Sequence, residues 1–283
     1  MLVRVISSVV LFPVLFFLVF YGGMPLKIGT IFVSLVGMYE FYRAIYKKIM
    51  PIHYLGFVTA IVYLLSIDFI YRDGHSLITI FLLFFLISLI FMVINHKKIS
   101  IFDVSVTLFS IIYIPFMFST IYLIKNLPLG NYLVWFPFIC AWACDTGAYF
   151  VGITMGKHKI TPKLSPKKTI EGAIGGVLFS AIFCSVYTLF ILNNMDRQII
   201  INNIAINKYI FIALAFLLGS ITAVFAQFGD LTASAIKRKF DIKDYGNLIP
   251  GHGGILDRFD SVIFTSGVCY VIIMSGTTIL GLY

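Results

Sequence analysis

Long apolar blocks separated by short polar segments fill almost the whole chain. A helix crosses a bilayer in about 20 residues, and charge-poor blocks near that length recur. They predict nine membrane-spanning helices, at 4–27, 28–42, 48–68, 76–95, 103–125, 126–144, 172–195, 209–229 and 261–283. The block at 28–42 has the weakest support, because it is short and Glu40 interrupts it near its end.

The composition agrees with this pattern. Hydrophobic residues occupy 60% of the 283 positions and charged residues only 12%, and the mean hydropathy is +1.01. A soluble domain carries about 25% charged residues, so the solvent of this chain must be lipid. We expect an all-α, polytopic integral membrane protein, with N-terminal helices over 1–139 and C-terminal helices over 140–283 in one membrane-embedded unit. The four cysteines lie in apolar blocks without a metal-type spacing and are interpreted as structural.

The basic residues are distributed unevenly between alternate loops. Nine helices place the N-terminus and the segments 43–53, 95–102, 155–171 and 229–260 on one face, which then holds 16 of the 21 lysines and arginines. Such a bias marks the cytoplasmic face. We therefore expect a cytoplasmic N-terminus and an extracytoplasmic C-terminus, in the cell membrane. Topology explains much of the net charge of +9, and no nucleic-acid partner is expected.

The segment 157–171 is too polar to be a simple connector, since it holds five lysines among prolines and hydroxyl residues. One interpretation is a solvated cluster that only orients the protein in the membrane. The other is a phosphate-binding loop, because lysines and hydroxyls bind polyphosphates and a helix start offers free backbone N–H groups. On that second interpretation, Lys163, Ser165, Lys167 and Lys168 would contact substrate.

The segment 227–260 brings carboxylates, cations and glycines together. Asp230 follows about 20 apolar residues, at the predicted end of a helix, where a lone carboxylate is costly and usually pairs with a cation or a metal. Asp257 and Asp260 lie three positions apart and would share one face of a helix. Three glycines between 250 and 254 would let the backbone come close to a ligand.

Asp145 is a further carboxylate flanked by apolar residues. Each acid, taken alone, could be a helix cap or part of a structural ion pair. Their grouping beside ten basic residues favours divalent-metal phosphate chemistry, because Mg²⁺ prefers a few carboxylates together with substrate phosphates. His158 and His252 lie in polar loops and suit hydrogen bonding better than ligation of a hard metal. Caps or interfacial anchors are the interpretation for Glu40, Asp68 and Asp103.

The run from Ser234 to Asp260 resembles the signature of phosphatidate cytidylyltransferases, the CDP-diacylglycerol synthases. The matching positions are Ser234, Lys237-Arg238, Lys243-Asp244, Gly246, Pro250, His252-Gly253-Gly254 and Asp257-Arg258-Phe259-Asp260. Two upstream blocks also resemble the family, at 145–149 and 165–172. The resemblance covers about 140–260, whereas the first half of the chain is similar only in its hydrophobicity and arrangement.

That resemblance implies a homodimeric membrane enzyme with a polar cavity open to the cytoplasm and the membrane. It implies that CTP and phosphatidate are converted into CDP-diacylglycerol and pyrophosphate, in phospholipid biosynthesis. Asp230 and Asp257 would hold a catalytic Mg²⁺, with room for a second cation, and Asp145, Lys167 and Lys168 would act in catalysis with them. Substrate binding would fall to Lys163, Ser165, Ser234, Lys237, Arg238, His252, Gly253, Gly254 and Arg258.

Two alternative functions are open at this point. Another lipid-phosphate-modifying enzyme, such as a CDP-alcohol phosphotransferase or a polyprenol kinase, would have a similar composition. The phosphotransferase hallmark opens with Asp-Gly, and the Asp73-Gly74 pair of this chain falls on the predicted outer face and continues differently. A membrane transporter would place its polar site near the midplane, often within paired repeats. Here the polar residues cluster toward one face and no repeat is visible.

Overall fold

The protein is almost entirely helical in a computed structural model that describes residues 2–46, 48–72, 75–194, 208–251 and 253–279. The helices are α1 (Leu2–Tyr21), α2 (Gly23–Ile45), α3 (His53–Leu65), α4 (Ile67–Arg72), α5 (His75–Ile94), α6 (Ile101–Ile111), the π-helical turn η1 (Ile112–Phe116), α7 (Met117–Lys125), α8 (Gly130–Leu133), α9 (Phe136–Thr154), α10 (Ile170–Asn194), α12 (Lys208–Lys239) and α13 (Leu256–Ile279). Two short strands, β1 (Lys159–Thr161) and β2 (Ser165–Thr169), form an antiparallel hairpin.

Seven helices within the described residues are long and apolar enough to cross a membrane. Two further apolar helices, at Leu11–Tyr21 and His53–Leu65, are shorter, so the predicted count of nine is not confirmed. The predicted first boundary was wrong. The chain breaks at Gly22, whose φ of 68° lies in the region that glycine adopts readily. As a result α2 is a full span of 23 residues instead of the short block that ends near Glu40.

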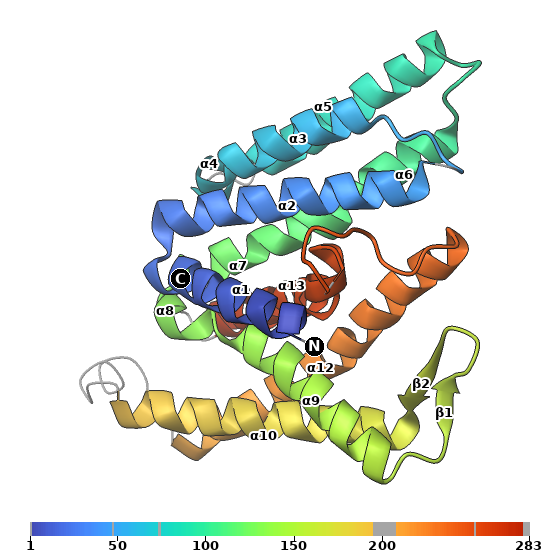
Figure 1. Ribbon diagram of the computed structural model, residues 1–283. Coiled ribbons are helices and arrows are strands. Elements are labelled where there is room, and N and C mark those ends of the chain that lie inside the picture. The colour runs from blue at the N-terminus through green and yellow to red at the C-terminus, as the bar shows by residue number, and fades with distance from the viewer. Residues whose placement is uncertain (1, 47, 73–74, 195–207, 252, 280–283) are drawn as a thin grey trace. The chain divides into compact units, whose positions relative to one another are not determined.

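The chain divides into two compact units, and the divisions fall between α7 and α8, within α12 and within α13. The first unit comprises 1–127 and 236–259. In it, α3 lies beside α5, and α2 and α6 lie next to them (Figure 1). Buried hydroxyl pairs join these helices, such as Tyr42 with Ser110 at 2.6 Å. Pro115, which lacks an N–H, lies in the π-helical turn that connects α6 to α7 without ending the span.

The second unit comprises 128–235 and 260–283. Its main packing is α9 against α10, along a seam of glycines that lets the two backbones approach closely. A Cβ atom at Gly176 would lie 2.8 Å from the carbonyl oxygen of Cys144. Cys144 also packs with Ala223 and Ala226 of α12 in a small buried cluster. The cysteines in the described residues are all buried and unbridged, as expected for structural thiols.

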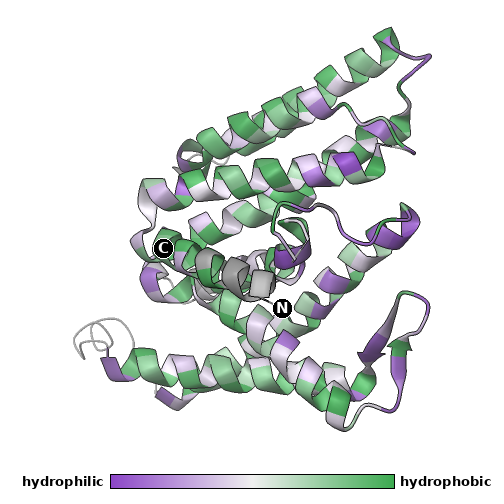
Figure 2. Ribbon diagram, in the orientation of Figure 1, coloured by the Kyte–Doolittle hydropathy of each residue, from purple (hydrophilic) through white to green (hydrophobic). Residues whose placement is uncertain are grey.

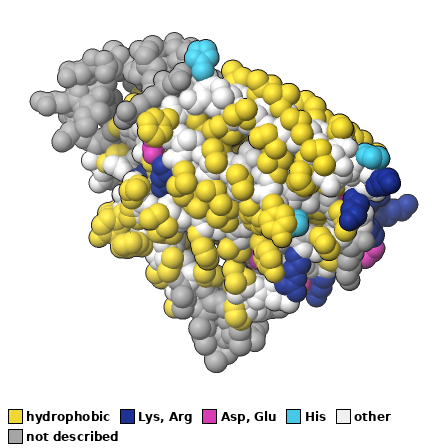
Figure 3. All heavy atoms as spheres, turned by 90° about the horizontal axis from the view of Figure 1, so that it is seen from above, with side chains coloured by type: hydrophobic (Ala, Val, Ile, Leu, Met, Phe, Trp, Pro, Cys, Tyr) yellow, Lys and Arg dark blue, Asp and Glu magenta, His cyan; other side chains and the backbone are white. Residues whose placement is uncertain are grey.

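The helix surfaces have the character of a membrane protein. In α5 only Phe84 and Ser88 are buried, while large apolar side chains such as Leu82 and Ile90 are exposed. A helix that is apolar all round and still exposed needs lipid as its solvent. The hydropathy of the residues shows the same contrast between apolar helices and polar segments, with polar residues gathered at the hairpin and at the end of α12 (Figure 2). In the space-filling view, hydrophobic side chains cover much of the face, and lysines and arginines gather at one edge (Figure 3).

Two predicted local structures were wrong. The segment 157–169 contains the β-hairpin instead of an irregular loop. The helix that carries Asp230 does not end at 229 but continues to Lys239, because the residues after Asp230 include several good helix formers and end with three basic residues that suit a helix C-terminus. It stops where Asp241 adopts φ 55°, and the N–H of Ile242 donates to the carbonyl of Lys237 as in a Schellman motif.

Candidate active site

The β-hairpin is anchored to the start of α10 by Glu171. Its carboxylate accepts hydrogen bonds from the backbone N–H groups of Lys157 and His158 and pairs with the His158 ring at 2.6 Å. The Thr169 hydroxyl accepts the N–H of Gly172 and so caps α10. These contacts fix the strand that carries Lys167 and Lys168, whose side chains point to opposite faces because neighbors on a strand alternate.

Lys168 joins the hairpin to the carboxylates of the second unit. Its Nζ lies 2.5 Å from Oδ2 of Asp230 on α12, and both side chains keep partial contact with solvent. Asp145 on α9 is within electrostatic reach of both groups, and it accepts a hydrogen bond of 3.3 Å from the hydroxyl of Ser261 on α13. The structure therefore brings together Lys168, Asp230 and Asp145, which the sequence predicted as catalytic.

A second acid–lysine pair lies in the first unit. Asp257, whose side chain is only 2% exposed, accepts a hydrogen bond of 2.8 Å from Nζ of Lys237 through Oδ1. Its other oxygen accepts the backbone N–H groups of Tyr245 and Gly254 at 2.8 and 3.0 Å. Lys237 also lies 5.5 Å from the center of the Tyr245 ring, a favorable cation–π distance. Asp257 thus binds both the ammonium of Lys237 and the backbone of the loop between α12 and α13 (240–255), which we call the glycine-rich loop.

A polar hollow of about 590 Å³ opens beside this loop. Its lining includes the cations Lys243 and Arg258, the acid Asp244, and Gly251 and Gly253. Gly251 and Gly253 have φ of 76° and 89°, where a side chain would be strained. Every residue that lines this hollow belongs to the segment 243–258, within the run that resembles a family signature.

The remaining predicted residues differ in exposure. Lys163, Lys167 and Arg238 are exposed, and Ser165 and Ser234 are half-buried. Asp260 accepts the N–H of Ser261 through Oδ1. His252 lies outside the described residues. Asp230 belongs to the second unit and Asp257 to the first, so their predicted sharing of one metal stays a prediction.

A group of three or more histidine, cysteine, aspartate or glutamate side chains that could hold a metal does not occur among the described residues. The acids that are present nevertheless suit a hard cation. Asp145 and Asp230 face one another's charge, and both Asp230 and Asp257 already lie against a lysine ammonium. Their oxygens are the ligand type that Mg²⁺ prefers, but a cation at Asp230 or Asp257 would have to compete with the lysine that now offsets the charge of that acid.

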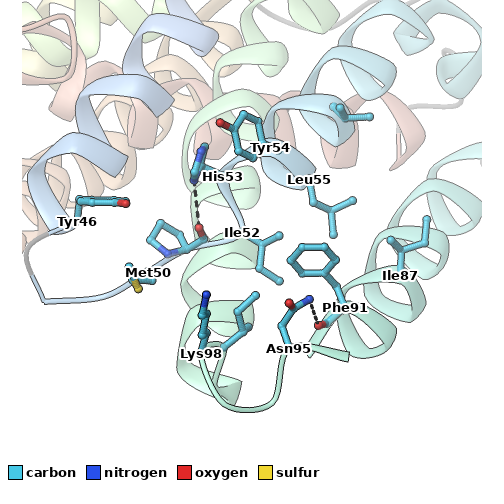
Figure 4. Close-up of a pocket in the computed structure, with 13 residues that line it drawn as sticks. Tyr46, Met50, Ile52, His53, Tyr54, Leu55, Ile87, Phe91, Asn95 and Lys98 are labelled. Carbon is cyan, nitrogen blue, oxygen red and sulfur yellow. Dashed lines mark hydrogen bonds between the residues drawn. The ribbon is translucent and has the colours of Figure 1, made fainter. Parts of the chain in front are cut away.

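A separate hollow of about 530 Å³ in the first unit has a different character. Leu55, Ile87 and Phe91 project toward it, and Asn95 and Lys98 lie at its margin (Figure 4). None of the predicted site residues lines it. Its lining is mostly apolar, and it has no carboxylate for phosphate or metal chemistry.

Glu40 is a residue whose placement the sequence did not predict. It is 3% exposed, and its carboxylate binds the backbone at the start of α13. The interpretation as a helix-end residue gave no indication that it would contact the loop some 215 positions further on. The one signal in the sequence that could have pointed to a buried role for Glu40 was that it is a lone acid in an apolar helix.

Comparisons with known proteins indicate the family of the chain. The chain matches the sequence model of the Cytidylyltransferase family over residues 2–275. It is 34% identical over 274 residues to a phosphatidate cytidylyltransferase of Bacillus subtilis, covering 95% of this chain and 96% of that protein. Phosphatidate cytidylyltransferases of Staphylococcus epidermidis and Staphylococcus aureus are each 32% identical over 269 residues, covering 93% of this chain and 95% of theirs.

Proposed function

The chain belongs to the cytidylyltransferase family, and on that premise we propose that it makes CDP-diacylglycerol and pyrophosphate from CTP and phosphatidate. The observation that carries the proposal is that signature residues fold into a polar hollow beside the Lys237–Asp257 pair, with two cations, Lys243 and Arg258, and one acid, Asp244, in its lining. This arrangement can receive a polyanion and neutralise its charge. Full-length similarity to proteins named for this reaction supports the same substrates.

The reaction needs little acid–base chemistry from the protein. A phosphate oxygen of phosphatidate attacks the α-phosphorus of CTP, the bond from that phosphorus to the bridging oxygen breaks, and pyrophosphate leaves. A phosphate monoester has its second pKa near about 6 and is largely ionised at neutral pH, so no general base is required. The difficulty is to bring two polyanions together, and the protein must neutralise charge and align the reactants.

The basic residues supply that neutralisation. We assign Lys167, Lys168, Lys237 and Arg238 to substrate phosphates. Lys168 and Lys237 each lie against an aspartate, which holds the ammonium in place until a phosphate competes for it. Arg258 and the glycine backbone of the polar hollow would receive the nucleotide. The acyl chains of phosphatidate would stay in the bilayer.

The family resemblance assigns a divalent cation to Asp230 and Asp257, and Mg²⁺ is our proposal. When bound, it supplies positive charge to the nucleotide phosphates and stabilises charge that develops on them. Asp145, beside Asp230, would contribute further negative charge there. The proposal also places the site at the cytoplasmic face of the cell membrane, in a homodimer.

The two alternative functions have less support. Family membership does not favor a transporter or a different lipid-phosphate enzyme. Of the predicted catalytic residues, Lys167 and Lys168 lie in the hairpin and Asp257 lies at the start of α13. Asp145 and Asp230 lie within α9 and α12, which are continuous helices and not the interrupted kind typical of transporters.

The test is an assay of purified protein in detergent–phosphatidate micelles. We expect pyrophosphate release only when CTP, phosphatidate and Mg²⁺ are all present, and formation of CDP-diacylglycerol in equal amount. EDTA should stop the reaction and added Mg²⁺ should restore it. A folded preparation that releases no pyrophosphate with CTP and phosphatidate would overturn the proposed function.

A further inference from the structure

Glu40 is a buried carboxylate near the end of α2, far in sequence from the signature residues. Its two oxygens each accept one backbone hydrogen bond of 3.0 Å, from Ile255 and from Leu256, where α13 begins. One turn earlier on the same face of α2, Gly37 lies against the side chain of Leu256. All of these residues belong to the first unit. This face of α2 therefore holds the start of α13.

The same carboxylate explains why glycine occupies two positions of the loop, where a larger residue would collide with it. A Cβ atom at Gly246 would lie 2.5 Å from Oε1 of Glu40, and the three nearest atoms all belong to Glu40. A Cβ atom at Gly254 would likewise meet only the Glu40 carboxylate among its three nearest atoms. The Glu40 carboxylate is pinned by two hydrogen bonds in a buried site, so it cannot move aside without losing them.

Glu40 and Asp257 together hold the loop from two sides. Asp257 accepts the N–H groups of Tyr245 and Gly254, and Glu40 accepts the next two N–H groups along the chain. The two carboxylates are close enough to repel, so this arrangement persists because backbone donors and Lys237 compensate their charge. A buried carboxylate used in this way fixes the loop more tightly than solvent-exposed contacts would.

We propose that Glu40 is a positioning residue of the active site, which holds the glycine-rich loop so that Asp257 and the cations of the polar hollow keep their alignment. The inference rests on the proposed function for what the loop does, but not for how Glu40 holds it. A shift of about 1 Å in a positioned group can cost on the order of 100-fold in rate. Glu40 would thus act on the reaction through backbone atoms, without touching substrate.

The first experiment compares Glu40→Gln with Asp103→Asn. Asp103 is a matched control, because it is also a buried acid of the first unit that accepts backbone N–H groups, from Met50 and Ser100, away from the loop. Glu40→Gln should lower kcat/KM for CTP by about 10- to 100-fold through a raised KM for CTP. KM for phosphatidate should stay within about twofold, and Asp103→Asn should leave both KM values unchanged.

The second readout does not depend on activity. Hydrogen exchange of the full-length protein in detergent, measured by mass spectrometry on the peptide around 244–258, reports how firmly the loop is held. Glu40→Gln should speed exchange of this peptide at least about tenfold relative to wild type, and Asp103→Asn should not. Unchanged exchange and unchanged KM for CTP in Glu40→Gln would overturn the inference.

A double-mutant cycle separates the contact from general destabilisation. Gly246→Ala should lower kcat/KM for CTP and loosen the loop in the wild-type background, because its methyl group collides with Glu40. In the Glu40→Ala background that space is free, so Gly246→Ala should add less than about a twofold effect. Additive effects would contradict the proposal. If wild type makes no CDP-diacylglycerol, the proposed function fails, while the same cycle read by hydrogen exchange still decides the role of Glu40.

Discussion

At the residue scale, the two acid–lysine pairs differ in burial, and this difference sets what each substitution should do. The Lys237–Asp257 pair is buried, with 15% and 2% of its side chains exposed, whereas Lys168 and Asp230 keep 25% and 35%. Breaking a buried pair by removing one partner costs about 3–5 kcal/mol, because a charge is left uncompensated. A partly exposed pair is screened by water and contributes much less to stability.

Lys168→Gln should therefore damage activity more than stability. We expect turnover to fall at least about 100-fold, because a charge that stabilises phosphate is lost, and the melting temperature to change little. Lys159→Gln on β1 is the control, since it removes an equal charge from the same hairpin at an exposed position. Changing Lys167 and Lys168 together should remove most activity without altering orientation. If Lys159→Gln and Lys168→Gln lowered turnover equally, the lysines of the hairpin would serve only to orient the protein in the membrane.

Asp230→Asn and Asp257→Asn should each nearly abolish catalysis, as the shared Mg²⁺ assignment requires. The double variant should be scarcely worse than either single one, because residues that act as a unit are not additive. Only Asp257→Asn should also lower the free energy of unfolding, since it disrupts the buried pair with Lys237 and two backbone contacts. Asp260→Asn should be milder.

The thermal response to Mg²⁺ gives a check that is independent of turnover. A ligand that binds only the folded state raises its stability, so added Mg²⁺ should raise the melting temperature of wild type. Each single variant should lose this response. A variant at Asp230 or Asp257 with full activity would falsify the metal assignment.

The sequence predicted some of these residues and missed others for definite reasons. Asp145 and Asp230 were recognisable because charge in an apolar context is conspicuous, and Lys168 because it belongs to a segment with five lysines among prolines and hydroxyl residues. Their mutual contacts follow from packing between helices distant in sequence, which local patterns do not encode. Glu40 is the extreme case, since its partners are backbone N–H groups that any residue could supply.

At the element scale, hydropathy located the helices but not their ends. The apolar block of α12 ends near Asp230, yet the helix runs on to Lys239, because leaving the apolar environment does not stop a helix that still has favorable residues. The hairpin was missed because its strands have three and five residues, too few for a period-two pattern to show, and prolines and lysines are poor strand formers.

The glycine seam between α9 and α10 gives a prediction at this scale. Gly176→Ala should destabilise the protein by about 1–3 kcal/mol, because the added methyl group would press on backbone and side-chain atoms of Cys144. Gly276→Ala is the matched control in α13, where a Cβ meets nothing within 4 Å. It should be neutral or stabilising by up to about 1 kcal/mol from helix propensity. Thermal unfolding monitored in detergent compares the two, and a Gly176→Ala variant as stable as wild type would show that the seam relaxes.

At the scale of the whole molecule, composition was the most reliable guide. The excess of apolar residues predicted a multi-pass membrane protein, which the seven candidate spans and the exposed apolar surfaces support. The count of spans is harder to predict, since a helix such as α3, with 13 residues, is apolar but too short to cross a bilayer unaided. The sidedness of the protein depends on how such helices are counted.

The uneven distribution of basic residues makes the sidedness testable. Lys163 lies in the hairpin, within the basic set, and Leu129 is an exposed residue just after the span that ends at Lys125. If the basic segments face the cytoplasm, Lys163→Cys should react with a membrane-impermeant maleimide only after the cells are opened. Leu129→Cys should react in intact cells. Background labelling should be low, because the four cysteines of the chain are buried. Labelling of both positions from the same side would overturn the predicted alternation of loops, and with it the cytoplasmic placement of the active site.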